Sequence, residues 1–353
     1  MKVSTLTDIP LHQARNILIR GTNWIGDAVM TLPAVGAIRN AFPEAKISVL
    51  AKPWVAEIYR LSPAVDEIVI FQSPGAHSGI LGKIRLAKQL RRMKFDMAIL
   101  LQNAIEAAII TLMAGIPIRA GYNSDGRGFL LTHSVRRSKA IRKVHQRDYY
   151  LEMVKSLGCH PEEINIFLKS GRDYEELAVK QLDELGIDSK EVLVGIAPGA
   201  TYGPAKRWFP ERFAAVSDRI IDNHFARVII FGSSEDRETA EEVQKHAKNR
   251  LINLAGKTNL KQTVALMGLC RLFISNDSGL MHVAGALNIS TVALFGSTNP
   301  VTTSPAGENS VVVYKNVSCS PCLQQRCPTD FRCMDAITVD DVYNMATWLL
   351  NGA

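Results

Sequence analysis

The amino-acid sequence predicts an α/β protein made of two doubly wound, Rossmann-like domains. Two observations support this prediction: short apolar runs alternate with helical patterns, and the alternation begins again after a polar helical segment near the middle of the chain. Such alternation is typical of parallel sheets that are covered by helices on both faces. Because these sheets bind ligands at the carboxyl ends of their strands, we expect the two domains to face a central cleft.

Apolar runs that predict strands occur in both halves of the chain. They cover residues 16–20, 47–51, 67–71, 96–101, 192–197, 227–231, 250–254, 272–275 and 291–295. We therefore predict an N-terminal domain at 1–166, an interdomain linker with a helix at 167–190 and a C-terminal domain at 191–337. A last helix at 338–353 is a candidate to pack back across the domain boundary.

The charge of the chain is distributed unevenly. Residues 1–170 contain 23 Lys and Arg against 13 Asp and Glu, whereas residues 171–353 contain 18 against 21. The N-terminal half is therefore expected to meet an anionic partner: nucleic acid, an acidic membrane surface or a phosphorylated substrate. The sequence lacks a signal-peptide pattern and the ~18 consecutive apolar residues of a membrane span, so we expect a cytoplasmic location.

Residues 80–93 have the pattern of an amphipathic helix with a basic face. The basic residues of this segment are Lys83, Arg85, Lys88, Arg91 and Arg92. The pattern has two interpretations, a solvated face on a core helix or a contact with an anionic membrane. Aromatic residues are not interleaved with the basic ones, which argues against single-stranded nucleic acid.

Residues 273–287 predict the end of a buried strand, a polar turn and a helix that starts at Ser278 or Gly279. A helix start presents unpaired N–H groups and the positive end of the helix dipole, and Gly279 has no side chain to keep an anion away. We therefore predict a phosphate-binding site. Asp277 is expected to orient the loop or a ligand hydroxyl, and His282 is either a bonded helix-face histidine or a further contact.

Three more loops follow predicted strands of the same domain. In the first, Lys206 is a compact charge suited to a diphosphate and Thr201 lies nearby, although Lys206 could also be solvated on a surface turn. In the second, Ser234 or Glu235 could hold a ribose hydroxyl, or simply begin a helix. In the third, Gly256 offers backbone groups against which a purine could lie.

Asp27 is the candidate catalytic residue of the N-terminal domain. It closes a Gly-containing loop, 21–27, that leads from the first predicted strand into a helix. The loop lacks the three-glycine dinucleotide fingerprint, so NAD binding is not predicted. Asp27 is then either a first-turn carboxylate favoured by the helix dipole or a proton acceptor for a hydroxyl nucleophile.

Four cysteines lie close together near the end of the chain: Cys319, Cys322, Cys327 and Cys333. Their spacing, C-x2-C-x4-C-x5-C, is close to that of compact zinc knuckles. The interpretations are a structural zinc site, an iron–sulfur site or four reduced thiols without a metal.

Five segments together resemble glycosyltransferase family 9 along nearly the whole chain. They are 21–33, 114–122 (Ala114-Gly115-Ile116-Pro117 and Arg119 to Tyr122), 198–208, 231–236 and 275–287. The resemblance implies a GT-B fold, with an ADP-heptose donor in the C-terminal domain and a lipid-anchored acceptor bearing phosphate and Kdo in the N-terminal one. It assigns Asp27 as the general base and Lys206 as a diphosphate contact. It places Thr201, Asp277, Ser278, Gly279 and His282 at the nucleotide-sugar site, with Glu235 or Ser234 as a further contact.

The reaction implied by this resemblance is an inverting transfer of heptose from ADP-heptose to the first heptose of the lipopolysaccharide inner core, without a catalytic cofactor. The expected protein is a monomer that acts at the inner face of the inner membrane and does not bind nucleic acid. Alternatives are an earlier or later heptose transfer, another hexosyltransferase, a nucleotide-sugar epimerase, or a non-catalytic basic adaptor on membrane or nucleic acid.

Overall fold

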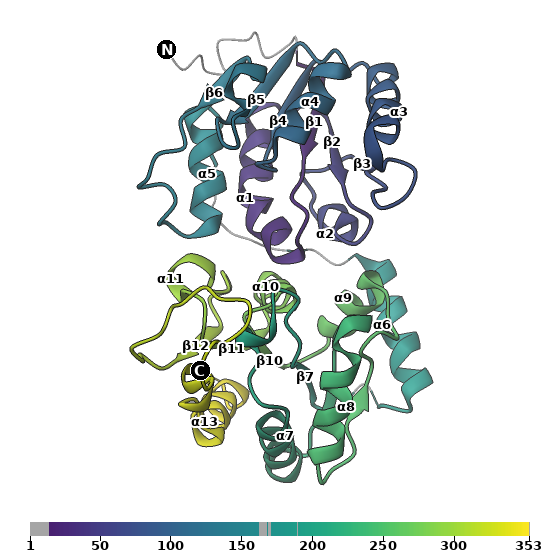
Figure 1. Ribbon diagram of the computed structural model, residues 1–353. Helices are drawn as coiled ribbons and strands as arrows, with labels where there is room; N and C mark the ends of the chain where they lie inside the picture. Colours follow the sequence, from purple (N-terminus) through teal and green to yellow (C-terminus); the bar gives the residue numbers. More distant parts are fainter. Residues whose placement is uncertain (1–13, 162–167, 169–170, 189, 353) are drawn as a thin grey trace. The chain divides into compact units, whose positions relative to one another are not determined.

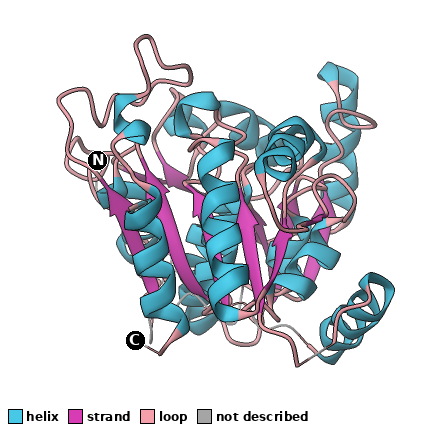
Figure 2. Ribbon diagram, turned by 90° about the horizontal axis from the view of Figure 1, so that it is seen from below, coloured by secondary structure: helices cyan, strands magenta, loops and turns pink. Residues whose placement is uncertain are grey.

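The fold is that of a computed structural model, which describes residues 14–161, 168, 171–188 and 190–352. The chain divides into two compact units, Met1–Ile166 and Phe167–Ala353 (Figure 1). Each unit contains one six-stranded sheet whose paired strands are all parallel. Figure 2 shows strands that run between layers of helices, so the predicted α/β class with two doubly wound units is confirmed.

The first unit orders its strands β3-β2-β1-β4-β5-β6. The strands are β1 Asn16–Arg20, β2 Lys46–Ala51, β3 Glu67–Ile70, β4 Met97–Leu100, β5 Ile118–Tyr122 and β6 His133–Val135. The helices are α1 Ile25–Ala41, α2 Ala56–Arg60, α3 Gly79–Arg92, α4 Ile105–Met113, the 3-10 helix η3 Arg127–Leu130 and α5 Gln146–Ser156. Because β1 has a neighbour on either side and helices over both faces, its Ile17, Leu18 and Ile19 are fully buried.

The second unit orders its strands β12-β11-β10-β7-β8-β9. The strands are β7 Leu193–Ala197, β8 Arg227–Ile230, β9 Ile252–Asn253, β10 Leu272–Asn276, β11 Ser290–Phe295 and β12 Ser310–Tyr314. The helices are α6 Arg172–Leu185, η4 Pro204–Lys206, α7 Pro210–His224, η5 Ser234–Asp236, α8 Arg237–His246, α9 Leu260–Met267, α10 Gly279–Ala286, α11 Pro300–Thr303, α12 Arg332–Asp335 and α13 Val339–Leu350.

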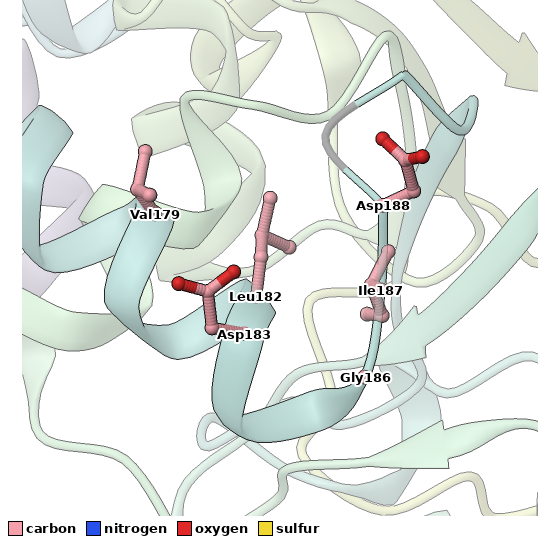
Figure 3. A pocket seen from close by; sticks show the side chains of 6 residues that line it. All are labelled: Val179, Leu182, Asp183, Gly186, Ile187 and Asp188. Carbon is pink, nitrogen blue, oxygen red and sulfur yellow. The ribbon is translucent and has the colours of Figure 1, made fainter.

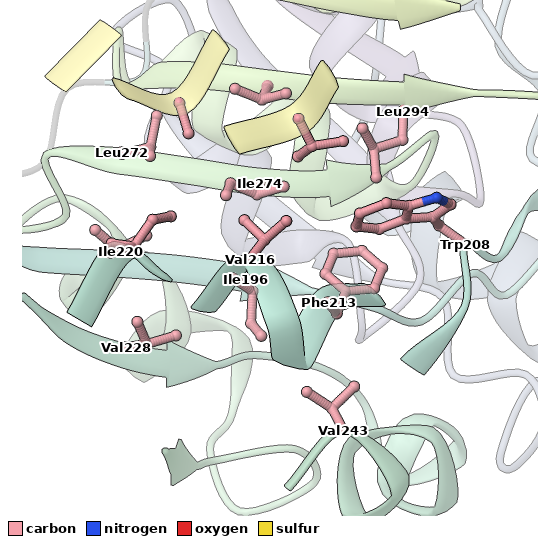
Figure 4. Close-up of a cluster of buried hydrophobic side chains, with 14 of the residues drawn as sticks. Ile196, Trp208, Phe213, Val216, Ile220, Val228, Val243, Leu272, Ile274 and Leu294 are labelled. Atoms are coloured by element: carbon pink, nitrogen blue, oxygen red, sulfur yellow. The ribbon is translucent and has the colours of Figure 1, made fainter. Parts of the chain in front are cut away.

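Trp208 fills the core of the second unit between α7, α13 and the sheet (Figure 4). Its ring is fully buried and packs edge-on against Phe213, with 5.2 Å between the ring centroids. The indole N–H donates to the Ile337 carbonyl at 2.9 Å, which satisfies the one polar atom of a buried indole. The loop that ends at Trp208 is therefore anchored in the core.

The helices at the two ends of the second unit pack within it. α6, the helix of the predicted linker, lies against α9, and α13 lies against α7 and β11. Residues 167, 169–170 and 189 of the predicted linker are outside the described residues, and the four predicted domain limits stay predictions. So does a contact of the last helix across the domain boundary.

Three strands of the structure, β5, β6 and β12, are not among the predicted runs. β6 has three residues, and β5 contains Arg119 and Gly121, which interrupt its apolar pattern. β12 is the Val-rich edge strand of the second sheet. Its composition favours a strand, so nothing in the sequence explains why residues 310–314 are missing from the predicted strands.

Candidate functional site

Lys206 and Asp277 form a buried ion pair at the carboxyl edge of the second sheet. The Lys206 Nζ lies 2.6 Å from Asp277 Oδ2, and the two side chains are 13% and 4% exposed. Lys206 ends η4 in the loop after β7, and Asp277 follows the neighbouring strand β10. Thr298, in the loop after β11, donates its hydroxyl hydrogen to the same Oδ2 at 2.7 Å. Loops from three adjacent strands thus hold one ammonium group in place.

Asn276 ties two of these loops together. Its amide nitrogen donates to the Pro198 carbonyl at 2.7 Å, and its Oδ1 accepts from the Trp208 N–H at 3.0 Å. Asn276 is fully buried, so these hydrogen bonds are shielded from water. Lys206 therefore stands on a rigid loop, and the alternative of a solvated surface turn is wrong for this residue.

The start of α10 lies directly after Asp277. Ser278 caps the helix: its Oγ accepts from the Met281 N–H at 3.4 Å and lies 3.0 Å from the Ser275 Oγ. Gly279 is the first helical residue, has no side chain and is partly exposed, so its N–H is a candidate donor to an anion. His282 is 5% exposed and is engaged with other groups of the protein.

The loop after β8 contains the two candidate ribose contacts and one buried carboxylate. Ser234 and Glu235 are exposed on η5. Asp236 is buried, and its Oδ2 accepts from the Ser233 N–H at 2.9 Å and from the Ser233 hydroxyl at 2.8 Å. Its Oδ1 is buried and has no hydrogen-bond partner within the described part of the chain.

Gly256 lies against the same loop. Its N–H donates to the Gly232 carbonyl at 2.9 Å, and its φ is +67°. A Cβ at this position would come within 2.8 Å of the Ser234 Cα, which the backbone cannot yield easily. Only glycine fits both the angle and the space, so the loops after β8 and β9 stay closely apposed. Thr201, in the loop after β7, is exposed.

Asp27 lies in the first unit, in the first turn of α1, and is partly exposed. It interacts with other groups of the protein. Tyr150 of α5 is buried nearby, and burial, followed by the negative charge of Asp27, raises the pKa of its phenol well above the usual range. The phenol therefore stays protonated as a neutral group near the candidate base.

Two buried cations, Arg20 and Lys52, lie at the carboxyl edge of the first sheet. Arg20 ends β1 and is 3% exposed, and Lys52 follows β2 and is 8% exposed. Both stand over the ring of Phe71, the guanidinium carbon at 5.2 Å and the Nζ at 4.0 Å from its centroid. Their hydrogen bonds go to neutral oxygens: the carbonyls of Gly21, Leu50 and Ser73 and the amide oxygen of Asn23.

Sequence reasoning missed five residues that the structure brings to these edges. They are Arg20, Lys52, Tyr150, Asn276 and Thr298. Arg20, Lys52 and Asn276 each end a strand or directly follow one, so a search of strand ends for polar residues would have found them. Tyr150 gives no such signal because it lies on a helix that meets α1 only through tertiary packing.

The segment that carries the four cysteines, residues 319–333 (the cysteine segment), packs onto the Lys206 loop. The Tyr202 hydroxyl donates to the Leu323 carbonyl at 2.9 Å, and the Ala205 N–H donates to the Gln325 carbonyl at 3.1 Å. The Lys206 Nζ lies 4.9 Å from the centroid of the Tyr202 ring, within the range of a cation–π contact. Residues 323–325 are thus an outer support for the loop that carries Lys206.

The predicted zinc site is not confirmed. All four cysteines are free, and burial, followed by the neighbouring thiol of Cys319, raises the pKa of the Cys333 thiol. Across the described ranges, however, no three His, Cys, Asp or Glu side chains are grouped so that they could hold a metal ion. The spacing of the cysteines therefore brings them near one another without building a ligand set.

A shallow depression lies at the end of α6, away from the candidate residues (Figure 3). It is lined by Val179, Leu182, Asp183, Gly186, Ile187 and Asp188. It contains none of the predicted site residues, and we assign no ligand to it.

The α3 helix presents both charge and apolar side chains to solvent. Ile80 and Leu81 are each 79% exposed in its first turn. Lys83 pairs with Glu106 of α4 at 3.2 Å, and Lys88 is exposed further along. Among the residues that the structure describes, no helix is both long and apolar enough to cross a membrane.

The fold of two doubly wound units is that of the GT-B glycosyltransferases. The family model of Glycosyltransferase family 9 (heptosyltransferase) matches residues 83–331. The chain belongs to this family and is a glycosyltransferase.

Individual proteins that are similar to this chain are also heptosyltransferases. Lipooligosaccharide heptosyltransferase 2 of Haemophilus ducreyi is 32% identical, over 84% of this chain and 88% of that protein. Lipopolysaccharide heptosyltransferase 2 of Escherichia coli is 31% identical, over 84% and 87%. The solved structure of E. coli ADP-heptose lps heptosyltransferase II matches with a TM-score of 0.81 and 27% identity, over 95% of this chain and 98% of that one.

Proposed function

We propose that the protein transfers L-glycero-D-manno-heptose from ADP-heptose to the first heptose of heptosyl-Kdo2-lipid A and releases ADP. Relatives named heptosyltransferase 2 support this step. The observation that carries it is the buried Lys206–Asp277 pair beside the start of α10. That arrangement offers an ammonium group and N–H groups to a diphosphate at one sheet edge.

In the proposed reaction Asp27 accepts the proton of the acceptor hydroxyl as its oxygen bonds to the anomeric carbon of the donor. The bond from that carbon to the β-phosphate oxygen breaks, and ADP leaves with the electron pair. Attack from the face opposite ADP inverts the anomeric configuration. Lys206, with the N–H groups near Gly279, stabilises the charge that develops on the diphosphate. The reaction as written needs no catalytic cofactor.

The remaining candidate residues contact the rest of the donor in this proposal. Asp277 and Thr298 hold the Lys206 ammonium, and Thr201 lies in the same loop. Ser234 or Glu235 meets a ribose hydroxyl, and the backbone at Gly256 lies against the purine. His282 supports the diphosphate end from inside α10.

The test of the reaction is product formation from ADP-heptose with acceptors that carry zero, one and two heptoses. We expect the acceptor with one heptose to be used at least tenfold more efficiently than the other two. Preference for the acceptor with none or with two would assign the earlier or later transfer instead. A donor screen in which UDP-sugars outperform ADP-heptose would refute the proposal.

Asp27→Asn tests the base. We expect turnover to fall about 10²- to 10⁴-fold, because a positioned general base contributes that much, while the affinity for ADP is unchanged. Asp340→Asn is a matched control, since Asp340 is also an acidic first-turn residue, in α13. Near-normal turnover of Asp27→Asn would place the base elsewhere.

We also propose that the enzyme works in the cytoplasm, as a monomer, with α3 against the anionic inner face of the inner membrane. The exposed Ile80 and Leu81 and the basic residues that follow them suit such a surface. Lys88→Glu should weaken binding to vesicles that contain anionic lipid, whereas Lys245→Glu in α8 should not. Equal binding of both variants would contradict the assignment. Light scattering of the purified protein tests the monomer.

A structural zinc ion held by the four cysteines stays our proposal for the end of the second unit. Its support is the C-x2-C-x4-C-x5-C spacing and the sulfur ligand type, which zinc prefers. Binding would require the side chains to close up from the arrangement described above. Metal analysis of protein purified without chelators decides the matter, and less than stoichiometric zinc would remove the proposal.

A further inference from the structure

We propose that Arg20 and Lys52 form a subsite for an oxyanion, a phosphate or a carboxylate, carried by the acceptor saccharide. The inference rests on the proposed function, since it concerns the substrate that provides the attacking hydroxyl. It assigns a role to two cations that belong to no predicted motif.

The first step of the argument is charge. Arg20 and Lys52 are 3% and 8% exposed, and neither forms an ion pair with a carboxylate among the residues that the structure describes. Glu106 is the carboxylate whose charge reaches both, but it lies 3.2 Å from the ammonium of Lys83. Arg20, Lys52 and Lys83 thus depend on the charge of the same carboxylate, which is too little to balance all three.

A buried charge without a partner is unfavourable, and two like charges close together are more so. Burial lowers the pKa of Arg20 to about 10, and burial, followed by the charge of Arg20, lowers the pKa of Lys52. The carbonyl oxygens that these side chains bind would accept equally well from a neutral donor. The Phe71 ring favours the two charges but carries no net negative charge, whereas an anionic ligand would supply the missing counter-charge.

The second step is position. Arg20 donates to Asn23 Oδ1 at 2.8 Å, and the Trp54 indole N–H donates to the Asn23 carbonyl at 2.8 Å. The first bond joins Arg20 to the loop that leads into α1, whose first turn contains Asp27. The second joins the same loop to Trp54, and the Lys52 Nζ stands 5.7 Å from the centroid of the Trp54 ring. Both cations lie at the carboxyl edge of the first sheet, as does that loop. An oxyanion held by them would fix the acceptor at the edge where the candidate base lies.

The third step is a neutral donor in the same cluster. His77 is 7% exposed, and its Nδ1 accepts from the Gln72 N–H at 3.0 Å, so its Nε2 carries the hydrogen. Burial, followed by the charges of Arg85 and Lys52, lowers the pKa of His77. It stays neutral near pH 7 and adds no further charge, while its Nε2–H remains a donor.

Lys52→Met tests the subsite, with Lys52→Arg and Lys46→Met as controls. Lys46 is the first residue of the same strand β2, so it lies at the amino ends of the strands, and it is paired with Glu67. We expect Lys52→Met to raise the acceptor KM about 10- to 100-fold, the range of a lost charged hydrogen bond, with the donor KM unchanged. Lys52→Arg should restore much of the affinity, and Lys46→Met should match the wild type.

Two acceptor series distinguish the sources of the anion. If Lys52→Met no longer raises the KM of acceptors that lack phosphate, the subsite binds a phosphate. If it no longer raises the KM of acceptors whose carboxylates are methyl esters, the subsite binds a carboxylate. Inorganic phosphate should also compete with acceptor in the wild type and not in Lys52→Gln, which retains a polar side chain if Lys52→Met does not fold.

A wild-type acceptor KM in Lys52→Met and Lys52→Gln, with normal transfer, overturns the subsite and leaves the proposed function standing. An effect that persists with acceptors free of both anionic groups also overturns it. Failure of the wild type to use ADP-heptose overturns the proposed function instead. The two failures are therefore distinct.

Discussion

The cations at the two sheet edges stand in opposite electrostatic settings. In the second unit, the Lys206 ammonium has a buried counter-charge, Asp277, at 2.6 Å. In the first unit, Arg20 and Lys52 are as deeply buried but bind only neutral oxygens. One edge is therefore neutral before any ligand arrives, and the other is positive.

The difference indicates two ways to bind an anion. A paired ammonium is fixed in position, so that it can orient a diphosphate whose charge rises as the leaving group departs. Unpaired cations can bind a ligand that supplies the missing negative charge. Without the ligand they lower the stability of the protein. The proposed donor and acceptor match this division.

The largest expected effect is the loss of the buried counter-charge. Asp277→Ala should destabilise the second unit by about 3–5 kcal/mol, because Lys206 would be left as a buried charge without its partner. The double variant Asp277→Ala/Lys206→Met should recover much of this loss. Urea unfolding followed by tryptophan fluorescence and by circular dichroism measures both.

Asp335→Ala is the control for that comparison. Asp335 also pairs with a basic residue, in this case Arg212, but the Asp335 side chain is 62% exposed. Removing it should change the free energy of unfolding by only about 0–1 kcal/mol. Equal losses in the two variants would mean that burial does not distinguish the pairs.

The next effect concerns ligand binding. Lys206→Met should weaken ADP binding about 10- to 100-fold, since a charged hydrogen bond contributes ~1.5–3 kcal/mol. The comparison variant is Lys257→Met, an exposed lysine in the loop after β9. Calorimetry with ADP gives the affinities, and the double variant Lys206→Met/Asp277→Asn separates lost binding from lost stability. Unchanged affinity would count against Lys206 as the diphosphate contact.

A smaller effect is expected at Tyr202. Tyr202→Leu should weaken ADP binding about 2- to 5-fold, because the ring face that attracts the Lys206 ammonium is lost, a contact of ~0.5–1 kcal/mol at an exposed site. Tyr202→Phe keeps the ring and removes only the hydrogen bond to Leu323, so its affinity should lie between that of Tyr202→Leu and the wild type. If Tyr202→Phe lost more ADP affinity than Tyr202→Leu, the hydrogen bond to Leu323 would contribute more to ADP binding than the aromatic ring does.

The smallest effect, and the sharpest contrast with Asp277, is the stability of Lys52→Met. Because the pKa of Lys52 is lowered in the folded protein, the charged side chain destabilises the fold, and this penalty on folding stability is fully present at pH 7. It fades as pH rises through the folded-state pKa toward the ordinary 10.5, so wild-type stability gains over that range. Lys52→Met should be at least as stable as the wild type at pH 7 and lack this gain. Urea midpoints at pH 7 and pH 10 test it, with Arg20, Lys83 and Glu106 unchanged as the neighbouring charges.

Much of the candidate site could be predicted from local pattern. The turn and helix start around Ser278 and Gly279 are encoded within a few residues, because an N-cap and the glycine after it act on their own backbone. The same holds for Asp27 in the first turn of α1. A glycine at position 256 indicates that the backbone has a positive φ there. It does not indicate the close contact with Ser234 that excludes a side chain.

The sequence by itself determined the alternation of strands and helices, the strand ends where polar loops gather and the uneven charge of the two halves. Only the tertiary structure decided that Lys206 pairs with Asp277, 71 residues away, because that contact depends on β10 lying beside β7. The same is true of Arg20 and Lys52, which meet over Phe71 because β1, β2 and β3 are neighbours. Local preferences act along the chain, whereas strand order and burial are properties of the whole sheet.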